Sequence, residues 1–215
     1  MNYTMLLGDR DTDGSIKQFV NSANIPSAQI LIEAEAWIYQ RLRAREMLTE
    51  VTGALTIGDV SVALSNFPRY RQPYLFYVPG TTVGIGSSFP SKENLETVIR
   101  HYSWDGAGAR AQGSITEYAI NASAIIFDNA VDRAYPYVFM YYQALEALSG
   151  SNETNFLTDQ YPTLLRTACM YRANEYRKDE GERLYWKAIS EDEVNDLNDS
   201  SDKELAALEL NIEIV

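Results

Sequence analysis

The sequence is poor in the residues that metal sites and nucleophilic active sites use most often. Its single histidine is His101 and its single cysteine is Cys169. One cysteine cannot form an intrachain disulfide, and one histidine with one cysteine is too few for a histidine-based zinc site. Cys169 lies between Ala168 and Met170, so we interpret it as a small buried hydrophobic residue. A serine–histidine–aspartate triad would depend on His101 alone, and no nucleophile elbow accompanies it.

Long apolar runs and an excess of positive charge are also missing. No stretch approaches the roughly 20 apolar residues that a membrane-spanning helix needs. Met1 to Leu7 has no basic region followed by an apolar run, so we expect no signal peptide. The formal net charge is -12. Because such a surface repels phosphates, we expect no membrane partner and no simple DNA binding, although brief contact with passing DNA is compatible with it.

Tyrosine, in contrast, is unusually abundant, with 15 residues beside 3 tryptophans and 7 phenylalanines. Tyrosine offers a large contact area at low entropic cost and is enriched at protein interfaces. Aromatic residues are also favoured in β-strands for their packing alone. The abundance of tyrosine therefore predicts either an interface or a β-rich core.

The N-terminal part of the chain predicts helices. A short helical segment is expected over residues 15–23, and Pro26 with Ser27 opens a helix that should run to about Met47. Its apolar residues recur at helical spacing, and they are Leu31, Ala34, Trp37, Ile38 and Leu42. Three arginines crowd its expected last turns, where cations interact favourably with the helix dipole; they are Arg41, Arg43 and Arg45.

Between about Thr49 and Gln143, β-branched and aromatic runs alternate with turn residues, which predicts strands. The expected strands are Ala54–Ile57, Val60–Ser65, Tyr74–Val78, Thr116–Asn121, Ala124–Phe127 and Tyr137–Gln143. Residues 91–100 fit either a short helix capped by Ser91 or a strand. Residues 104–113 contain three glycines and three alanines, which predicts a mobile loop.

Helical periodicity returns after Gly150. Pro162 should begin a helix that reaches Tyr176, and a second helix should cover residues 180–189, unless the two are one helix broken near Gly181. From Asp179 to Val215, twelve acidic residues stand against three basic ones, a net charge of -9. This excess is typical of a solvated helix and tail.

The final residues alternate between apolar and polar side chains. The apolar members are Leu208, Leu210, Ile212 and Ile214. This period of two predicts a strand with one apolar face. A terminal strand cannot bury that face alone, so it needs a sheet edge in its own subunit or in a neighbour.

Three patterns come close to a chemical motif. Aspartates at positions 9, 11 and 13 begin like a calcium loop, but Val20 stands where a bidentate glutamate is required, so an acidic turn capping the next helix fits better. The glycines of residues 80–86 lack the lysine of a phosphate-binding loop, which favours a hairpin tip. A carboxylate pair for glycoside hydrolysis stays open, because the separation of carboxylates cannot be read from a sequence.

Several motifs follow one another in a characteristic order. A Tyr-x-Ile strand at 118–120 precedes a Tyr-Tyr strand at 141–142 that leads to Leu148-Ser149. A Tyr-Pro-x-Leu helix start at 161–164 is then followed by Asp179-Glu180 and Trp186. With Ala34-Glu35 and Arg41-Leu42-Arg43 in the first long helix, this order resembles the head-to-tail adaptor, connector or neck proteins of tailed phages. The resemblance covers most of the chain and is weakest over residues 80–113.

The resemblance implies a structural virion protein that is not an enzyme and uses no cofactor. Such a protein forms a ring, commonly of twelve copies, that connects the portal to the tail and lines the DNA channel. Its expected partners are other copies of itself, the portal protein and tail or nozzle proteins, with transient non-specific contact with genomic DNA. It would be made in the host cytoplasm and reside at the head–tail junction of the virion.

The resemblance also implies an α+β fold, with a helical bundle from the N- and C-terminal segments, a β-rich, sandwich-like antiparallel insertion and an extended C-terminal tail. The expected boundaries are 1–48 for the N-terminal helices, 49–150 for the insertion, 151–200 for the C-terminal helices and 201–215 for a docking tail.

Candidate partner-interface residues come from the tail and from the end of the first long helix. They are Leu208, Leu210, Ile212, Ile214, Trp37, Arg41 and Arg45. Two other functions stay open. One is a carbohydrate-binding module that uses aligned aromatic side chains of the β-rich region. The other is a carboxylate-dependent cell-wall hydrolase of a phage tail.

Overall fold

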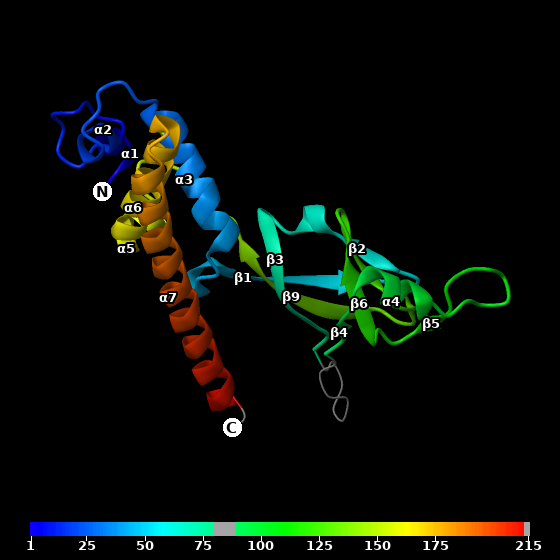
Figure 1. The fold of residues 1–215 in the computed structure, drawn as a ribbon. Coiled ribbons are helices and arrows are strands. Elements are labelled where there is room, and N and C mark those ends of the chain that lie inside the picture. Colours follow the sequence, from blue (N-terminus) through cyan, green and yellow to red (C-terminus); the bar gives the residue numbers. More distant parts are fainter. Residues whose placement is uncertain (80–88, 213–215) are drawn as a thin grey trace. The chain divides into compact units, whose positions relative to one another are not determined.

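The computed structural model describes residues 1–79 and 89–212 and has a mixed α+β fold, as predicted (Figure 1). The chain divides into two compact units. The helical unit joins Met1–Glu46 with Ala144–Val215, and the β unit is Met47–Gln143. The glycine-rich segment 80–86, expected to be a hairpin tip, lies outside the described residues.

Three long helices form most of the helical unit. They are α3 (Ser27–Arg41), α6 (Pro162–Arg177) and α7 (Glu180–Ile212), and α6 packs against both of the others. The short elements of this unit are α1 (Tyr3–Leu6), α2 (Ile16–Phe19), α5 (Phe156–Gln160) and the 3-10 turn η1 (Arg45–Met47). Because α2 and α5 also contact α6, this helix is the centre of the unit.

The starts of the long helices follow the sequence signals, but two of their ends do not. Pro162 occupies the first turn of α6, as expected. The last residue of α6 is Arg177, and the left-handed φ of 59° at the following Lys178 ends the helix before Gly181. The first long helix was predicted to reach Met47, but α3 ends at Arg41 and Leu42 is extended. Arg43 and Arg45 therefore lie beyond the helix.

The strand predicted for the last residues is wrong over the part that the structure describes. Leu208, Leu210 and Ile212 belong to α7, which continues from Glu180 to Ile212, and Ile214 lies outside the described residues. The preceding run Lys203–Leu208 consists of strong helix formers, and extending an existing helix needs no new nucleation. Helix propagation thus overrides the period-two pattern, and the tail is not extended before residue 213.

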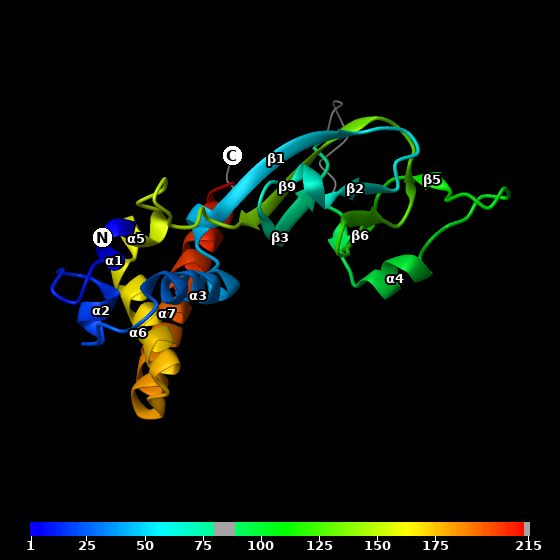
Figure 2. The same cartoon turned by 90° about the horizontal axis from the view of Figure 1, so that it is seen from above.

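The β unit contains a three-stranded antiparallel sheet and a four-stranded sheet. The first has the order β1 (Leu48–Leu55), β9 (Tyr135–Gln143), β3 (Tyr70–Tyr77), and Figures 1 and 2 show β1 and β9 side by side. The second has the order β2 (Ser61–Ala63), β7 (Ala124–Phe127), β6 (Glu117–Ile120), β4 (Ser91–Lys92), with only β4 and β6 parallel. A short parallel pair, β5 (Gln112–Gly113) with β8 (Ala130–Val131), completes the strands of the described chain.

Each predicted strand of this region overlaps an observed one, and Ala124–Phe127 matches β7 at both ends. The 3-10 turn η2 (Leu64–Asn66) replaces the end of the predicted strand Val60–Ser65. Residues 91–100 contain both alternatives, since strand β4 is followed by helix α4 (Leu95–Arg100). Asn94 and not Ser91 caps α4, because its side chain accepts a hydrogen bond from the Thr97 amide.

The tyrosines and phenylalanines of the β unit build its core. Phe139 is fully buried, and its ring lies 4.7 Å from that of Phe67, 6.2 Å from Phe76 and 5.6 Å from Tyr141. Burial also raises the pKa of Tyr118 to about 12. Among the described residues of this unit, the large aromatic side chains left strongly exposed are Phe89 and Trp104. The abundance of aromatic residues therefore serves mainly the interior.

Removing the ring at the centre of this core should destabilise the β unit. We expect Phe139→Ala to lower the free energy of unfolding by about 3–5 kcal/mol, because it removes buried area and leaves a cavity. Urea unfolding followed by circular dichroism measures the change. The control Ile57→Ala, at a side chain that is 62% exposed, should stay within about 0.5 kcal/mol of the wild type. Equal losses for the two variants would contradict this assignment of the core.

Candidate functional site

Neither metal-binding nor membrane-spanning groups were found in the described part of the chain. No cluster of three or more histidine, cysteine, aspartate or glutamate side chains could hold a metal ion there. No helix of residues 1–79 or 89–212 is both long and apolar enough to cross a bilayer. The acidic turn at residues 9–14 precedes helix α2, as expected, but Ser15 and not an aspartate caps that helix. Asp13 accepts a hydrogen bond from the Gln18 side chain, and Asp9 forms an ion pair with Lys17.

A buried carboxylate in α3 holds the chain where it re-enters the helical unit. Glu35 is 3% exposed, and both of its oxygens accept the Leu148 amide at 3.2 Å. Glu35 also accepts hydrogen bonds from the Asn155 side chain at 2.9 Å and from the Tyr39 hydroxyl at 3.1 Å. Burial raises the pKa of Glu35, although these hydrogen bonds oppose the shift. Glu35 thereby fixes the segment that leads into α5.

Helix α7 holds the chain where it leaves the helical unit. The Asn198 side chain accepts the Arg43 amide at 2.7 Å and donates to the Arg41 carbonyl at 3.0 Å, and Ser201 Oγ accepts the Arg45 amide at 3.3 Å. These bonds satisfy groups that the end of α3 would otherwise leave without partners. They hold residues 41–45, which run from the last residue of α3 to the first of η1, against α7, and we call this segment the arginine strap.

The arginine strap separates apolar from charged side chains. Leu42 and Ala44 are each 1% exposed, whereas Arg41, Arg43 and Arg45 are exposed. The backbone of Leu42 is extended, and in extended backbone successive side chains point to opposite sides. The result is three cations in a row on the surface of a protein with a net charge of -12.

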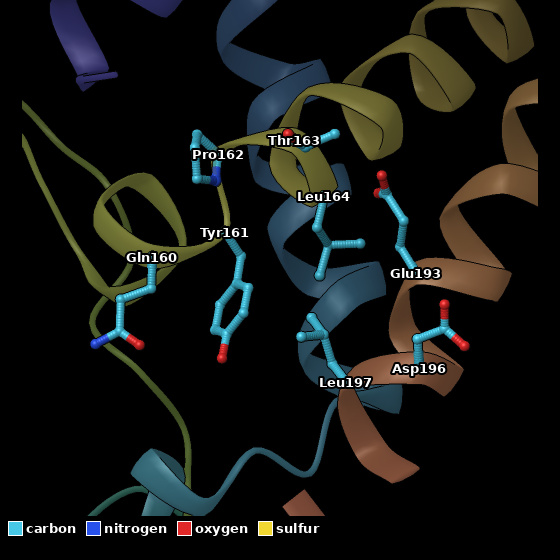
Figure 3. Close-up of a pocket in the computed structure, with 8 residues that line it drawn as sticks. All are labelled: Gln160, Tyr161, Pro162, Thr163, Leu164, Glu193, Asp196 and Leu197. Atoms are coloured by element: carbon cyan, nitrogen blue, oxygen red, sulfur yellow. The ribbon is translucent and has the colours of Figure 1, made fainter. Parts of the chain in front are cut away.

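A pocket of about 260 Å³ lies between the start of α6 and the middle of α7 (Figure 3). Its lining is apolar at Pro162, Leu164 and Leu197, and acidic at Glu193 and Asp196. One Glu193 oxygen accepts the Thr167 hydroxyl at 2.8 Å, while Asp196 is exposed and has no ion-pair partner among the described residues. The pocket thus combines an apolar wall with carboxylates, which suits a long cationic side chain.

Tyr161 completes this pocket and lies close to the strap. Burial raises the pKa of Tyr161, and the negative charges of Glu46 and Glu204 raise it further, whereas Arg45 lowers it. Arg45 in turn forms an ion pair with Glu204 at 3.3 Å. Tyr161, at the edge of the pocket, is therefore close enough to Arg45 for their charges to interact.

A second surface lies on the β unit, in the region expected to be a mobile loop. Asp105 accepts the amides of Ala107 and Ala109 at 2.9 and 2.8 Å, and Arg110 lies 3.6 Å from the centre of the Tyr102 ring. Arg110 also donates to the carbonyl of Phe127. These contacts define the conformation of the loop, and its mobility stays a prediction.

The interface residues expected from sequence lie in different environments. Trp37 is 2% exposed and packs edge-on against Tyr171, with the Arg41 guanidinium 4.7 Å above its ring. The structure therefore places Trp37 in the core and not on a surface. Arg41 and Arg45 are exposed on the strap. Leu208, Leu210 and Ile212 lie in the last turns of α7.

Sequence patterns gave little sign of the buried polar residues that hold the chain at the strap and before α5. Asn198 and Ser201 lie within an acidic run and resemble solvated residues, and Glu35 lies beside the exposed positions of an amphipathic helix. A weak signal exists for Glu35, because Ala34 and Ile38 flank it on the buried face of α3.

In the helical unit, buried polar groups thus position the chain, and the strap carries an exposed row of arginines. A family model described as SU10 adaptor protein matches residues 3–209, so the chain belongs to the SU10 adaptor protein family. This match confirms the resemblance to phage head-to-tail adaptors and identifies a structural phage protein that associates with other phage structural proteins. The search of curated proteins found no match.

The pH dependence of stability should reveal the buried carboxylate. Because burial raises the pKa of Glu35, its contribution to stability is complete below the pKa of the unfolded chain and is lost as the pH rises through the folded pKa. Above about pH 4.3, the ordinary pKa of glutamate, the wild type should therefore lose stability relative to Glu35→Gln.

Urea unfolding at a series of pH values tests this expectation. Glu33→Gln, a change on the same helix that leaves Glu35 in place, should keep the pH dependence of the wild type. A constant difference in unfolding free energy between wild type and Glu35→Gln across the whole pH range would show that Glu35 is not desolvated in solution.

Proposed function

We propose that this chain is one subunit of a ring-shaped head-to-tail adaptor that connects the portal to the tail and lines the DNA channel. The family match over residues 3–209 is the observation that carries the proposal. In the proposed subunit, α3, α6 and α7 form a helical bundle built from both ends of the chain. The β unit is a β-rich insertion into that bundle.

The electrostatics of the chain suit a channel through which DNA moves. With a net charge of -12, the subunit repels phosphates, so passing DNA makes only transient, non-specific contact. At physiological ionic strength this repulsion acts over a Debye length of about 8 Å. A wall of this kind keeps the genome from adhering during ejection.

The proposed partners are other copies of the chain, the portal protein and tail or nozzle proteins. Identical subunits that associate head to tail close into a ring when the rotation between neighbours divides a full turn, and twelve copies is the number expected here. The assembled ring belongs to the virion, at the junction of head and tail. Leu208, Leu210 and Ile212, in the last turns of α7, are proposed to contact a partner there, together with Ile214.

Mixing the purified chain with the portal of the same phage tests the proposal. We expect several copies to bind one portal, because a ring subunit gains contacts both to the portal and to its neighbours. Native mass spectrometry gives the number of bound copies. The portal of an unrelated phage serves as control and should bind none. Absence of any complex with the cognate portal would refute the adaptor function.

Shortening the C-terminus tests the role of its apolar residues. Deleting residues 209–215 should weaken association with the portal by about tenfold or more, which corresponds to about 1.4 kcal/mol of lost contacts. Folding should persist, because the contacts of α7 with the strap through Asn198 and Ser201 precede the deletion.

A chain that carries seven glycine and serine residues in place of residues 209–215 serves as the length-matched control. It should bind as weakly as the deletion, if the side chains rather than the length of the tail make the contact. Wild-type affinity in either variant would exclude the tail from docking.

A further inference from the structure

The arginine strap presents a row of three cations, of which only Arg45 forms an ion pair with a described residue of the subunit. The Arg43 guanidinium has no hydrogen-bond or ion-pair partner among the described residues, and Arg41 lies over the Trp37 ring. Arg45 is paired with Glu204, but both side chains stay about half exposed, at 47% and 53%. The three arginines alternate with the buried Leu42 and Ala44, so all three side chains reach the surface.

Helix α7 presents the opposite charge on one exposed face. Asp192, Asp196 and Asp199 are exposed and lie at helical positions i, i+4 and i+7, which places them on one face. At a rise of about 1.5 Å per residue they follow one another at roughly 6 and 4.5 Å along the axis. None of them forms an ion pair with a described residue, and Asp196 also borders the pocket beside α6.

The two charged strips of one subunit cannot meet each other. The strap is bound to the side of α7 that carries Asn198 and Ser201. At about 100° per residue, Asp196 lies some 200° from Asn198, and Asp192 lies about 180° from Ser201. The acidic face is therefore turned away from the strap that its own helix holds.

We propose that the arginine strap of one copy binds the acidic face of α7 in a second copy. Arg43 of the strap enters the pocket lined by Pro162, Leu164 and Leu197, where Asp196 and Glu193 meet its guanidinium. The carboxylates supply charge-assisted hydrogen bonds, and the apolar wall covers the aliphatic part of the side chain.

This arrangement makes the contact directional. Each subunit offers a strap on one side of α7 and an acidic face on the other, so the contact is heterologous and repeats from copy to copy. The inference rests on the proposed ring and identifies the surfaces that join its neighbours. DNA is a less suitable occupant of the strap, because a net charge of -12 surrounds the three arginines.

Charge reversal tests the contact in the full-length chain. One variant carries Arg41→Glu and Arg43→Glu, and the other carries Asp192→Lys and Asp196→Lys. Each should lower the affinity of copy for copy by about tenfold or more, because each places like charges opposite one another. Sedimentation velocity at low salt and native mass spectrometry of portal-bound copies give the affinity and the copy number.

Mixing the two variants provides the decisive measurement. The glutamates of the first then face the lysines of the second, and the remaining wild-type strips of the two chains also match. Assembly should return to within about threefold of the wild type, and 0.5 M salt should weaken the wild-type contact because exposed charges are screened. If the mixture stays as defective as its components, the inference is overturned.

Matched controls separate this contact from overall charge and from folding. Arg10→Glu with Arg133→Glu and Asp11→Lys with Asp132→Lys change the net charge equally at other exposed positions, and both should assemble as the wild type does. Arg43→Glu alone keeps the Arg41 contact with Trp37, so it should show the defect with an unchanged melting temperature.

The possible outcomes distinguish the inference from the proposed function. Wild-type assembly by both reversed variants overturns the strap contact and leaves the adaptor ring standing. Failure of the wild type itself to form multimers, even on the portal, overturns both. Binding of a DNA duplex that depends on Arg41 and Arg43, with self-association unaffected, would assign the strap to DNA and also overturn the inference.

Discussion

The helical unit depends on buried polar groups that hold the chain at its two crossings to the β unit. Met1–Glu46 and Ala144–Val215 form one compact unit, and the intervening segment leaves it and returns to it at fixed points. Asn198 and Ser201 fix the departing segment, and Glu35 with Asn155 fixes the returning one. A buried hydrogen-bonding group without a partner costs about 1–3 kcal/mol, so these bonds select one path for each crossing.

The same groups connect the interior to the proposed interface. The hydrogen bonds of Asn198 and Ser201 are made to the backbone of the strap, which turns Leu42 and Ala44 inward and the arginines outward. The exposed side chains of the strap can therefore change to match a partner, because the hydrogen bonds that fix its backbone to α7 do not involve them. A charged strip built in this way is presented in a fixed conformation, which lowers the entropic cost of binding.

Local signals in the sequence predicted the elements better than their ends. Pro26 and Pro162 marked the starts of α3 and α6, and runs of β-branched and aromatic residues marked β6, β7 and β9. The end of α3 could not be predicted, because the bonds that hold Arg43 and Arg45 outside the helix come from residues more than 150 positions later in the chain. The alternation of apolar and polar residues at 208–214 predicted a strand. The helix formers that precede it instead extend α7 to Ile212.

The candidate site was predictable only in part, for the same reason. Arg41 and Arg45 stood out as cations in an acidic chain, whereas Trp37, which has the residue type most typical of interfaces, lies in the core. The pocket beside α6 joins residues about 30 positions apart in two helices, and no spacing rule brings Tyr161 and Asp196 together. The family itself could be inferred from the order of motifs, since that order reflects the sequence of elements and not their contacts.

The register of the first sheet has a consequence for how such proteins can diverge. Leu48 and Tyr142, at the two ends of the β unit, are direct partners in the antiparallel ladder of β1 and β9, and the Cα atoms of such partners are only about 4.5–5.5 Å apart. The chain therefore enters and leaves the β unit, Met47–Gln143, at neighbouring positions, as it does in a hairpin. During evolution the β unit can therefore be lengthened, shortened or exchanged without a change in the helices to which it is connected.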